Sequence, residues 1–169
     1  MNTGRQPEQD RQPEQSRRLM LAGVDGDVVT RSRDFTRTAL ADWGWLAAGG
    51  APDGRVDGEA AMVAEDVLLL VSEVVANACL HAGGPGSLLL LSTGSGLRIE
   101  VTDGSPSLPE LRRRADPTRP GGHGLLIVDR LTRNWGADPV LGGGKCVWLD
   151  VDAPAEVSRP EAGRPASRP

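Results

Sequence analysis

Apolar and polar positions along the chain first indicate two helices. Apolar side chains recur at three- to five-residue intervals over residues 28–48, which is the spacing of an amphipathic helix. Residues 59–82 contain neither glycine nor proline, and their centre is apolar nearly all round. A buried strand also shows a short apolar run, but the length without a breaker favours one long helix that stops at Gly83.

The remaining pattern is mostly strand-like. Two apolar runs flank Gly94-Ser95-Gly96 and predict a β-hairpin, and a glycine-rich stretch precedes a third expected helix, 125–133. The expected strands are 19–23, 87–93, 97–103, 134–140 and 146–151. Helices and a mostly antiparallel sheet in this mixed order predict an α+β fold, a two-layer α/β sandwich with the helices on one face of the sheet.

The two ends of the chain differ from its middle. Residues 1–18 are polar and contain a near-duplicated six-residue stretch, and residues 153–169 are rich in Pro, Arg and Ala. Segments with so little apolar surface to bury are expected to be disordered. The sequence therefore predicts a single domain over residues 19–152 between a disordered N-terminal segment and a disordered tail.

Composition narrows the classes of partner. The formal net charge of the 169 residues is −4, which argues against nucleic acid as a partner because binding phosphates needs clustered cations.

Residues 2–18 contain no apolar run of the kind found in a signal peptide, and no later apolar run reaches the ~18 residues of a membrane span. We therefore expect a cytoplasmic protein that binds no membrane. Cys79 and Cys146 lie among apolar residues and are expected to be free and buried.

The long helix carries the first candidate chemistry. Glu73, Asn77 and His81 are spaced four apart, so they share one helix face. A carboxylate and an amide in so apolar a helix are costly unless they meet solvent or a ligand. The alternative is an ordinary polar stripe facing water.

Asp103 is the second candidate. Period-two alternation puts Leu97, Ile99, Val101 and Asp103 on one strand face, the one that should pack on the helices. A carboxylate is thus expected at the strand end, with Gly104 allowing a ligand close to the backbone. The alternative is a turn-forming Asp-Gly pair.

The glycine-rich helix start is the third candidate. Gly121 to Gly124 precede an apolar run, and exposed amides at a helix start bind anions. The alternative is a simple helix entry, with His123 an exposed loop residue. The pattern is not that of a dinucleotide-binding fold, and Lys145 does not belong to a P-loop because Cys146 stands where Ser or Thr is required.

These stretches together resemble a known family. SEVVANACLHA (72–82), VTDGSP (101–106) and GHGLLIVDRL (122–131) resemble, in this order, the GHKL (histidine kinase-like) ATPase superfamily, with its Bergerat-type ATP-binding fold. Residues 135–136 and 142–148 are similar to the branch of anti-sigma-factor serine/threonine kinases. The resemblance covers about 28–151.

The resemblance implies roles for individual residues. Asn77 would hold Mg²⁺ at the phosphates of ATP, and Glu73 would act as general base or position the attacking hydroxyl. Asp103 would accept a hydrogen bond from the adenine amino group. The remaining nucleotide-binding residues would be Gly104, Gly122, His123, Gly124 and Leu125. The role of the loop arginines is left open between a solvated charge run and phosphate contacts: Arg112, Arg113, Arg114 and Arg119.

The function implied by the resemblance is that of a kinase. It would use Mg-ATP to phosphorylate a serine or threonine on an anti-anti-sigma protein, and it would also sequester a sigma factor. One alternative is a non-catalytic ATP-binding module of the same fold that switches partners. A sensor histidine kinase fragment is disfavoured because His81 and His123 both fall inside the expected ATP domain. The oligomeric state is left open, with a homodimer as one alternative.

Overall fold

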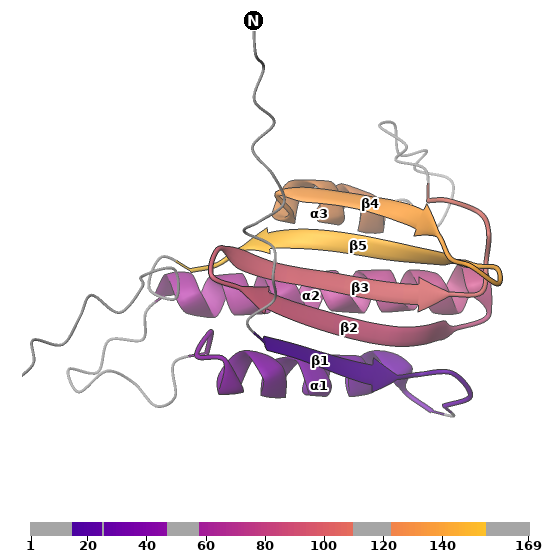
Figure 1. Ribbon diagram of the computed structural model, residues 1–169. Coiled ribbons are helices and arrows are strands. Elements are labelled where there is room, and N and C mark those ends of the chain that lie inside the picture. The colour runs from indigo at the N-terminus through magenta and orange to yellow at the C-terminus, as the bar shows by residue number, and fades with distance from the viewer. Residues whose placement is uncertain (1–14, 25, 47–57, 110–122, 155–169) are drawn as a thin grey trace, which may run out of the picture.

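The computed structural model describes residues 15–24, 26–46, 58–109 and 123–154. A five-stranded antiparallel sheet of order β1-β2-β3-β5-β4 forms one layer, and three helices form the other (Figure 1). The elements are β1 (Gln15–Met20), α1 (Val28–Asp42), α2 (Gly58–Ala82), β2 (Pro85–Thr93), β3 (Gly96–Asp103), α3 (His123–Leu131), β4 (Asn134–Pro139) and β5 (Lys145–Asp152). The α+β prediction is confirmed.

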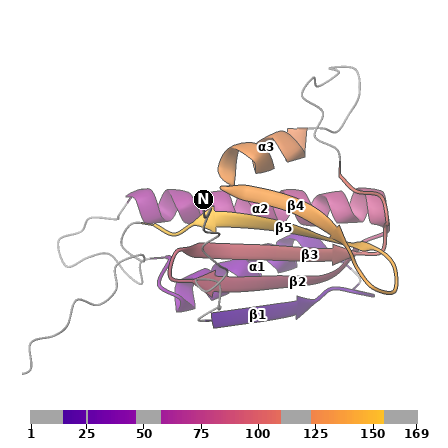
Figure 2. The same ribbon diagram turned by 45° about the horizontal axis from the view of Figure 1, so that its top comes forward.

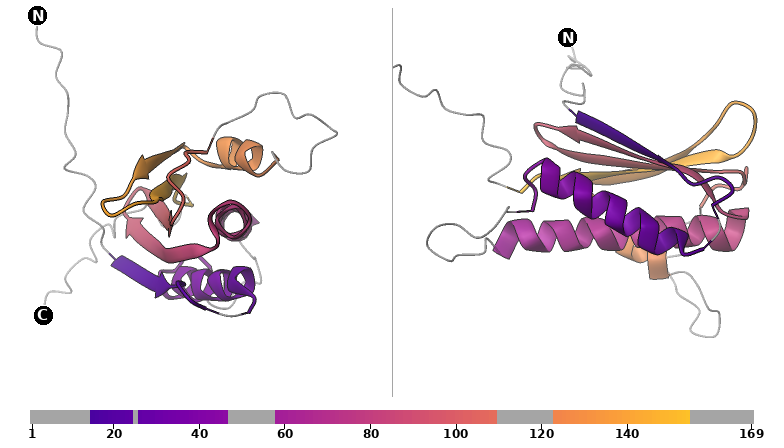
Figure 3. Two further views of the ribbon diagram at one scale, coloured as in Figure 1. Left: turned by 90° about the vertical axis from the view of Figure 1, so that its right-hand side faces the viewer. Right: turned by 90° about the horizontal axis from the view of Figure 1, so that it is seen from below.

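All three helices cover the same face of the sheet. The end-on view of Figure 3 shows α1 and α2 against that face, with α3 beyond α2 on the side of β4. Alternation along the central strands supplies the facing core, since Leu97, Ile99 and Val101 of β3 are at most 2% exposed. Each such side chain contributes roughly 1.5–3 kcal/mol on burial, which makes this interface the main source of stability.

The apolar character of α2 follows from its central position. Figure 1 places it along the middle of the helical layer, so most of its circumference is turned to α1, α3 or the sheet. Gly83 and Gly84, both with positive φ, end the helix, and the Gly84 N–H donates to the Ala78 carbonyl at 3.0 Å. The predicted stop of this helix is confirmed.

The domain begins earlier than predicted. The expected disorder of residues 1–18 is wrong for 15–18, because β1 starts at Gln15 rather than at residue 19. An edge strand needs main-chain pairing more than apolar side chains, and β1 pairs with β2 from Gln15–Ser92 to Met20–Ser87. Residues 1–14 and 155–169, the rest of the two predicted disordered ends, lie outside the described residues.

The observed ends of two helices differ by a few residues from the predicted ends. The helix expected over 28–48 ends at Asp42, because Gly44 at φ +75° turns the chain out of the helix and brings Trp45 into the core. The helix expected over 125–133 starts at His123 and ends at Leu131. Within the described part of the chain, none of the helices is long and apolar enough to cross a bilayer.

The cysteines are free, but the prediction that both are buried is wrong for Cys79. Its side chain is exposed in the last turns of α2, where the helix face turns away from the core. Cys146 is half-buried in β5, and burial raises the pKa of its thiol to about 11.

Candidate functional site

The apolar centre of α2, residues 67–80, contains three polar side chains, of which Ser72 donates to the Leu68 carbonyl and accepts from Arg33. Glu73 and Asn77 lie one turn apart, and both are half-buried. Neither side chain has a hydrogen-bond or ion-pair partner among the described residues. Unpaired polar groups in such a position are costly unless water or a ligand satisfies them, so this face of α2 is prepared for a polar contact.

The start of α3 lies directly on this polar pair. A β-carbon added to Gly124 would stand 2.7 Å from Glu73 Oε2 and 3.3 Å from Asn77 Nδ2. Only a residue without a side chain allows the backbone of α3 to come so close. The first amides of a helix lack intrahelical partners, so Glu73 and Asn77 share a site with donors suited to an anion.

Asp103 ends β3 on the helix-covered face. Its side chain is only 4% exposed, and its Oδ1 accepts hydrogen bonds from the Ser105 N–H at 2.8 Å and from Lys145 Nζ at 2.9 Å. The expected inward placement of this carboxylate is confirmed. Its ion pair with a lysine was not expected.

Lys145 is the residue that the sequence analysis missed. It is the first residue of β5 and the register partner of Asp103, and its side chain is 8% exposed. Period-two alternation with Val147 and Leu149, both buried, was the available signal, because it places Lys145 on the inward face.

Gly144 holds β5 close to the end of β3. It adopts φ +88°, and a β-carbon there would stand 2.1 Å from the Asp103 carbonyl oxygen. A side chain at this position would separate the two strands where Lys145 and Asp103 meet. At Gly104, by contrast, an added β-carbon would meet nothing within 4 Å, so the space beside that residue is open.

The three predicted stretches lie toward the same half of the domain. Asp103 pairs with Pro85, which follows the end of α2 by only three residues. Figure 1 shows the arrowhead of β3 and the last turns of α2 at the same edge, and Figure 2 shows α3 over the middle of α2. The polar pair of α2 therefore adjoins the start of α3, in the half of α2 that leads to the end of β3.

The structure describes only some of the remaining predicted site residues. Leu125 is half-buried in α3, and His81 is exposed one turn beyond Asn77. His123 begins α3, but its side chain is outside the described part of the structure. Gly122 and the loop arginines also fall outside it: Arg112, Arg113, Arg114 and Arg119.

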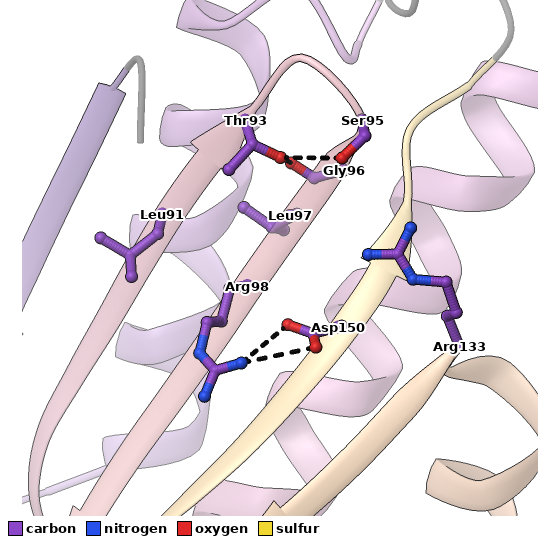
Figure 4. A pocket seen from close by; sticks show the side chains of 8 residues that line it. All are labelled: Leu91, Thr93, Ser95, Gly96, Leu97, Arg98, Arg133 and Asp150. Carbon is purple, nitrogen blue, oxygen red and sulfur yellow. Dashed lines mark hydrogen bonds and ion pairs between the residues drawn. The ribbon is translucent and has the colours of Figure 1, made fainter. Parts of the chain in front are cut away.

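A cavity of about 70 Å³ lies elsewhere, between β2, β3 and β5 (Figure 4). Arg98 and Asp150 line it, with Arg98 Nη1 donating to Asp150 Oδ1 at 3.1 Å. It sits at the start of β3, roughly 20 Å along the strand from Asp103 at about 3.3 Å per residue. Its volume is far below the ~300 Å³ of small-molecule sites, so it offers no alternative nucleotide pocket.

Comparison with known families identifies the class of this domain. Residues 29–151 match the family described as Histidine kinase-like ATPase domain. The match covers most of the chain and spans α1 to β5, so the chain belongs to this family. The GHKL resemblance is thereby confirmed at the level of the superfamily. Comparison with curated proteins gives no match.

Proposed function

We propose that this protein is a Mg-ATP-dependent serine/threonine kinase of the anti-sigma-factor type. In this proposal it phosphorylates an anti-anti-sigma protein and sequesters a sigma factor. Membership of the histidine kinase-like ATPase family supports nucleotide binding. The resemblance of residues 135–136 and 142–148 supports the anti-sigma branch.

One observation carries the proposal: the Glu73 carboxylate and the Asn77 amide have no partner among the described residues and lie against the first turn of α3. A purely structural polar stripe has no need of a helix N-terminus placed on it. A triphosphate has such a need, because it takes up main-chain N–H donors and presents its terminal phosphorus to neighbouring groups.

The donor set fits magnesium. Mg²⁺ prefers oxygen ligands, keeps several waters and is usually held by one or two protein groups together with substrate phosphates. The described residues contain no group of three or more His, Cys, Asp and Glu side chains that could hold a metal alone. Asn77 Oδ1 would therefore hold the ion together with the phosphates, and the ion would neutralise phosphate charge.

Glu73 then supplies the base. In the transfer step the hydroxyl oxygen of the partner's serine forms a bond to the γ-phosphorus, and the bond from that phosphorus to the β,γ-bridging oxygen breaks. The hydroxyl proton passes to the Glu73 carboxylate, and ADP is the leaving group. Positioning by Asn77 and by the α3 amides accounts for most of the rate, as is general for phosphoryl transfer.

Asp103 reads the base of the nucleotide in this proposal. Its carboxylate is a hydrogen-bond acceptor, which matches the amino group of adenine. Because a buried acceptor left without a donor costs free energy, a base that donates a hydrogen bond to Asp103 is favoured.

Incubation with γ-labelled ATP and candidate anti-anti-sigma proteins tests the proposal. Label on a serine or threonine of the partner supports the kinase. If ATP binds but no label is transferred, the kinase proposal is wrong and the alternative, a non-catalytic ATP-binding module that switches partners, is supported. No binding of ATP would contradict both readings.

A further inference from the structure

Among the residues that the structure describes, the contact between Asp103 and Lys145 leaves one N–H donor and one carboxylate oxygen without a partner. Lys145 Nζ donates to Asp103 Oδ1 at 2.9 Å and to the Ser105 carbonyl at 3.3 Å, and an ammonium has three N–H donors. Asp103 Oδ1 accepts two hydrogen bonds, whereas Oδ2 has no partner among the described residues. A free N–H donor therefore lies beside a free carboxylate oxygen.

We propose that Lys145 is a second base-reading residue, and that it makes the site accept purine triphosphates with a 6-oxo group as well as ATP. This inference rests on the proposed function in one respect: it takes Asp103 as the residue that contacts the purine ring of the nucleotide. It adds the class of nucleotide that the same site takes.

The argument comes from the edges of the two kinds of purine. Adenine presents an amino donor at position 6, whereas guanine and hypoxanthine present a carbonyl acceptor there. A site with only a carboxylate sets two acceptors against each other when a 6-oxo purine enters. Sites whose buried polar groups are left unpaired reject the wrong ligand by about 10⁴-fold or more.

An ammonium beside the carboxylate removes that conflict. Lys145 Nζ can donate to a 6-oxo group, while Asp103 Oδ2 accepts the N–H that 6-oxo purines carry at position 1. Adenine meets the same two groups after a shift of the ring in its own plane: Asp103 Oδ2 then accepts from the amino group, and Lys145 donates to the unprotonated ring nitrogen beside it. Both kinds of purine therefore find a donor and an acceptor.

The fold keeps Lys145 in this place. Its side chain is 8% exposed, so it does not extend freely into solvent, and the β3–β5 register fixes it opposite Asp103. The close approach at Gly144 fixes the backbone just before it. Lys145 is also the single lysine of the chain, whose other fixed cations are all arginine.

Binding of ATP and inosine triphosphate to the wild-type protein, measured by titration calorimetry with Mg²⁺, tests this directly. Inosine triphosphate changes position 6 and the adjoining N1 proton and leaves the rest of ATP intact. We expect its Kd to lie within about tenfold of that for ATP, a difference below ~1.4 kcal/mol. Tight ATP binding with inosine triphosphate weaker by more than that would overturn the inference while leaving the proposed function standing. Failure of both to bind would contradict the proposed function itself.

A variant assigns the effect to Lys145. In Lys145→Met we expect inosine triphosphate to lose at least tenfold more affinity than ATP does. Arg133→Met is the matched control: it removes one positive charge and an exposed ion pair with Asp152, and we expect it to leave the ratio unchanged. If folded Lys145→Met keeps the wild-type ratio of the Kd for inosine triphosphate to the Kd for ATP, the assignment to Lys145 is contradicted. If that variant does not fold, the wild-type titrations decide the inference.

Discussion

The Glu73 carboxylate lies directly behind Gly124, with its Oε2 only 2.7 Å from where a β-carbon of that residue would stand. The contact joins the middle of α2 to the first turn of α3. The two chain segments therefore meet at the carboxylate that takes up the proton in the proposed transfer step.

Gly124→Ala tests this fit. The new methyl group would push aside the end of the Glu73 side chain, whereas Ala is the better helix former by about 1 kcal/mol. We therefore expect an unchanged or slightly higher melting temperature, together with phosphate transfer at least tenfold slower. Gly58→Ala at the start of α2, where an added β-carbon meets nothing within 4 Å, is the control. Transfer by Gly124→Ala at the wild-type rate would contradict this view of the contact.

Removal of the proposed base should separate binding from chemistry. We expect Glu73→Ala to bind Mg-ATP with nearly wild-type affinity and to lose transfer to the partner, because the carboxylate acts on the attacking hydroxyl. Calorimetry measures the first effect and label transfer the second. Glu65→Ala, two turns earlier and exposed on α2, should change neither. Equal transfer by Glu73→Ala and wild type would rule out Glu73 as base.

Asp103→Asn tests base reading. The amide keeps the size of the side chain but replaces one acceptor with a donor and removes the charge that faces Lys145. We expect ATP affinity to fall at least tenfold, about 1.4 kcal/mol, by titration calorimetry. Asp34→Asn, at an exposed carboxylate of α1, should leave the affinity unchanged. Unaltered ATP binding by Asp103→Asn would remove this residue from the site.

The two cysteines should differ sharply in reactivity. The pKa of Cys146 is about 11, chiefly because of burial, so at pH 8 only about one molecule in a thousand carries the thiolate there. Cys79 is exposed. Iodoacetamide followed by mass spectrometry should show Cys79 modified first, with the rate at Cys146 still rising well above pH 9. Comparable rates at the two residues at pH 8 would contradict the described burial of β5.

The fold was readable from the sequence where periodicity was strong. The length of α2, the hairpin of β2 and β3 and the inward face ending at Asp103 all follow from local pattern. The start of β1 did not, because an edge strand is held by main-chain bonds to β2 and shows little apolar alternation.

The sequence predicted some residues of the candidate site but not the contacts between them. Motif order named Glu73, Asn77 and Asp103, but the partner of Asp103 depends on the β3–β5 register, which no local pattern reveals. The local sequence around Lys145 resembles at most a phosphate-binding loop, which Cys146 excludes. The approach of Gly124 to Glu73 is likewise a tertiary contact between distant segments, so spacing along the chain could not supply it.

The central claim is that α2 and the start of α3 surround a metal–triphosphate. Replacing Mg²⁺ by paramagnetic Mn²⁺ with ATP and recording amide and indole NMR signals tests it most directly, because Mn²⁺ broadens the signals of nearby protons steeply with distance. We predict strong broadening at Glu73, Asn77 and Gly124, with the Trp148 indole N–H, which donates to Asp138 on the uncovered sheet face, left sharp. Sharp signals along α2 with ATP bound, or broadening centred on the uncovered face of the sheet, would contradict the account.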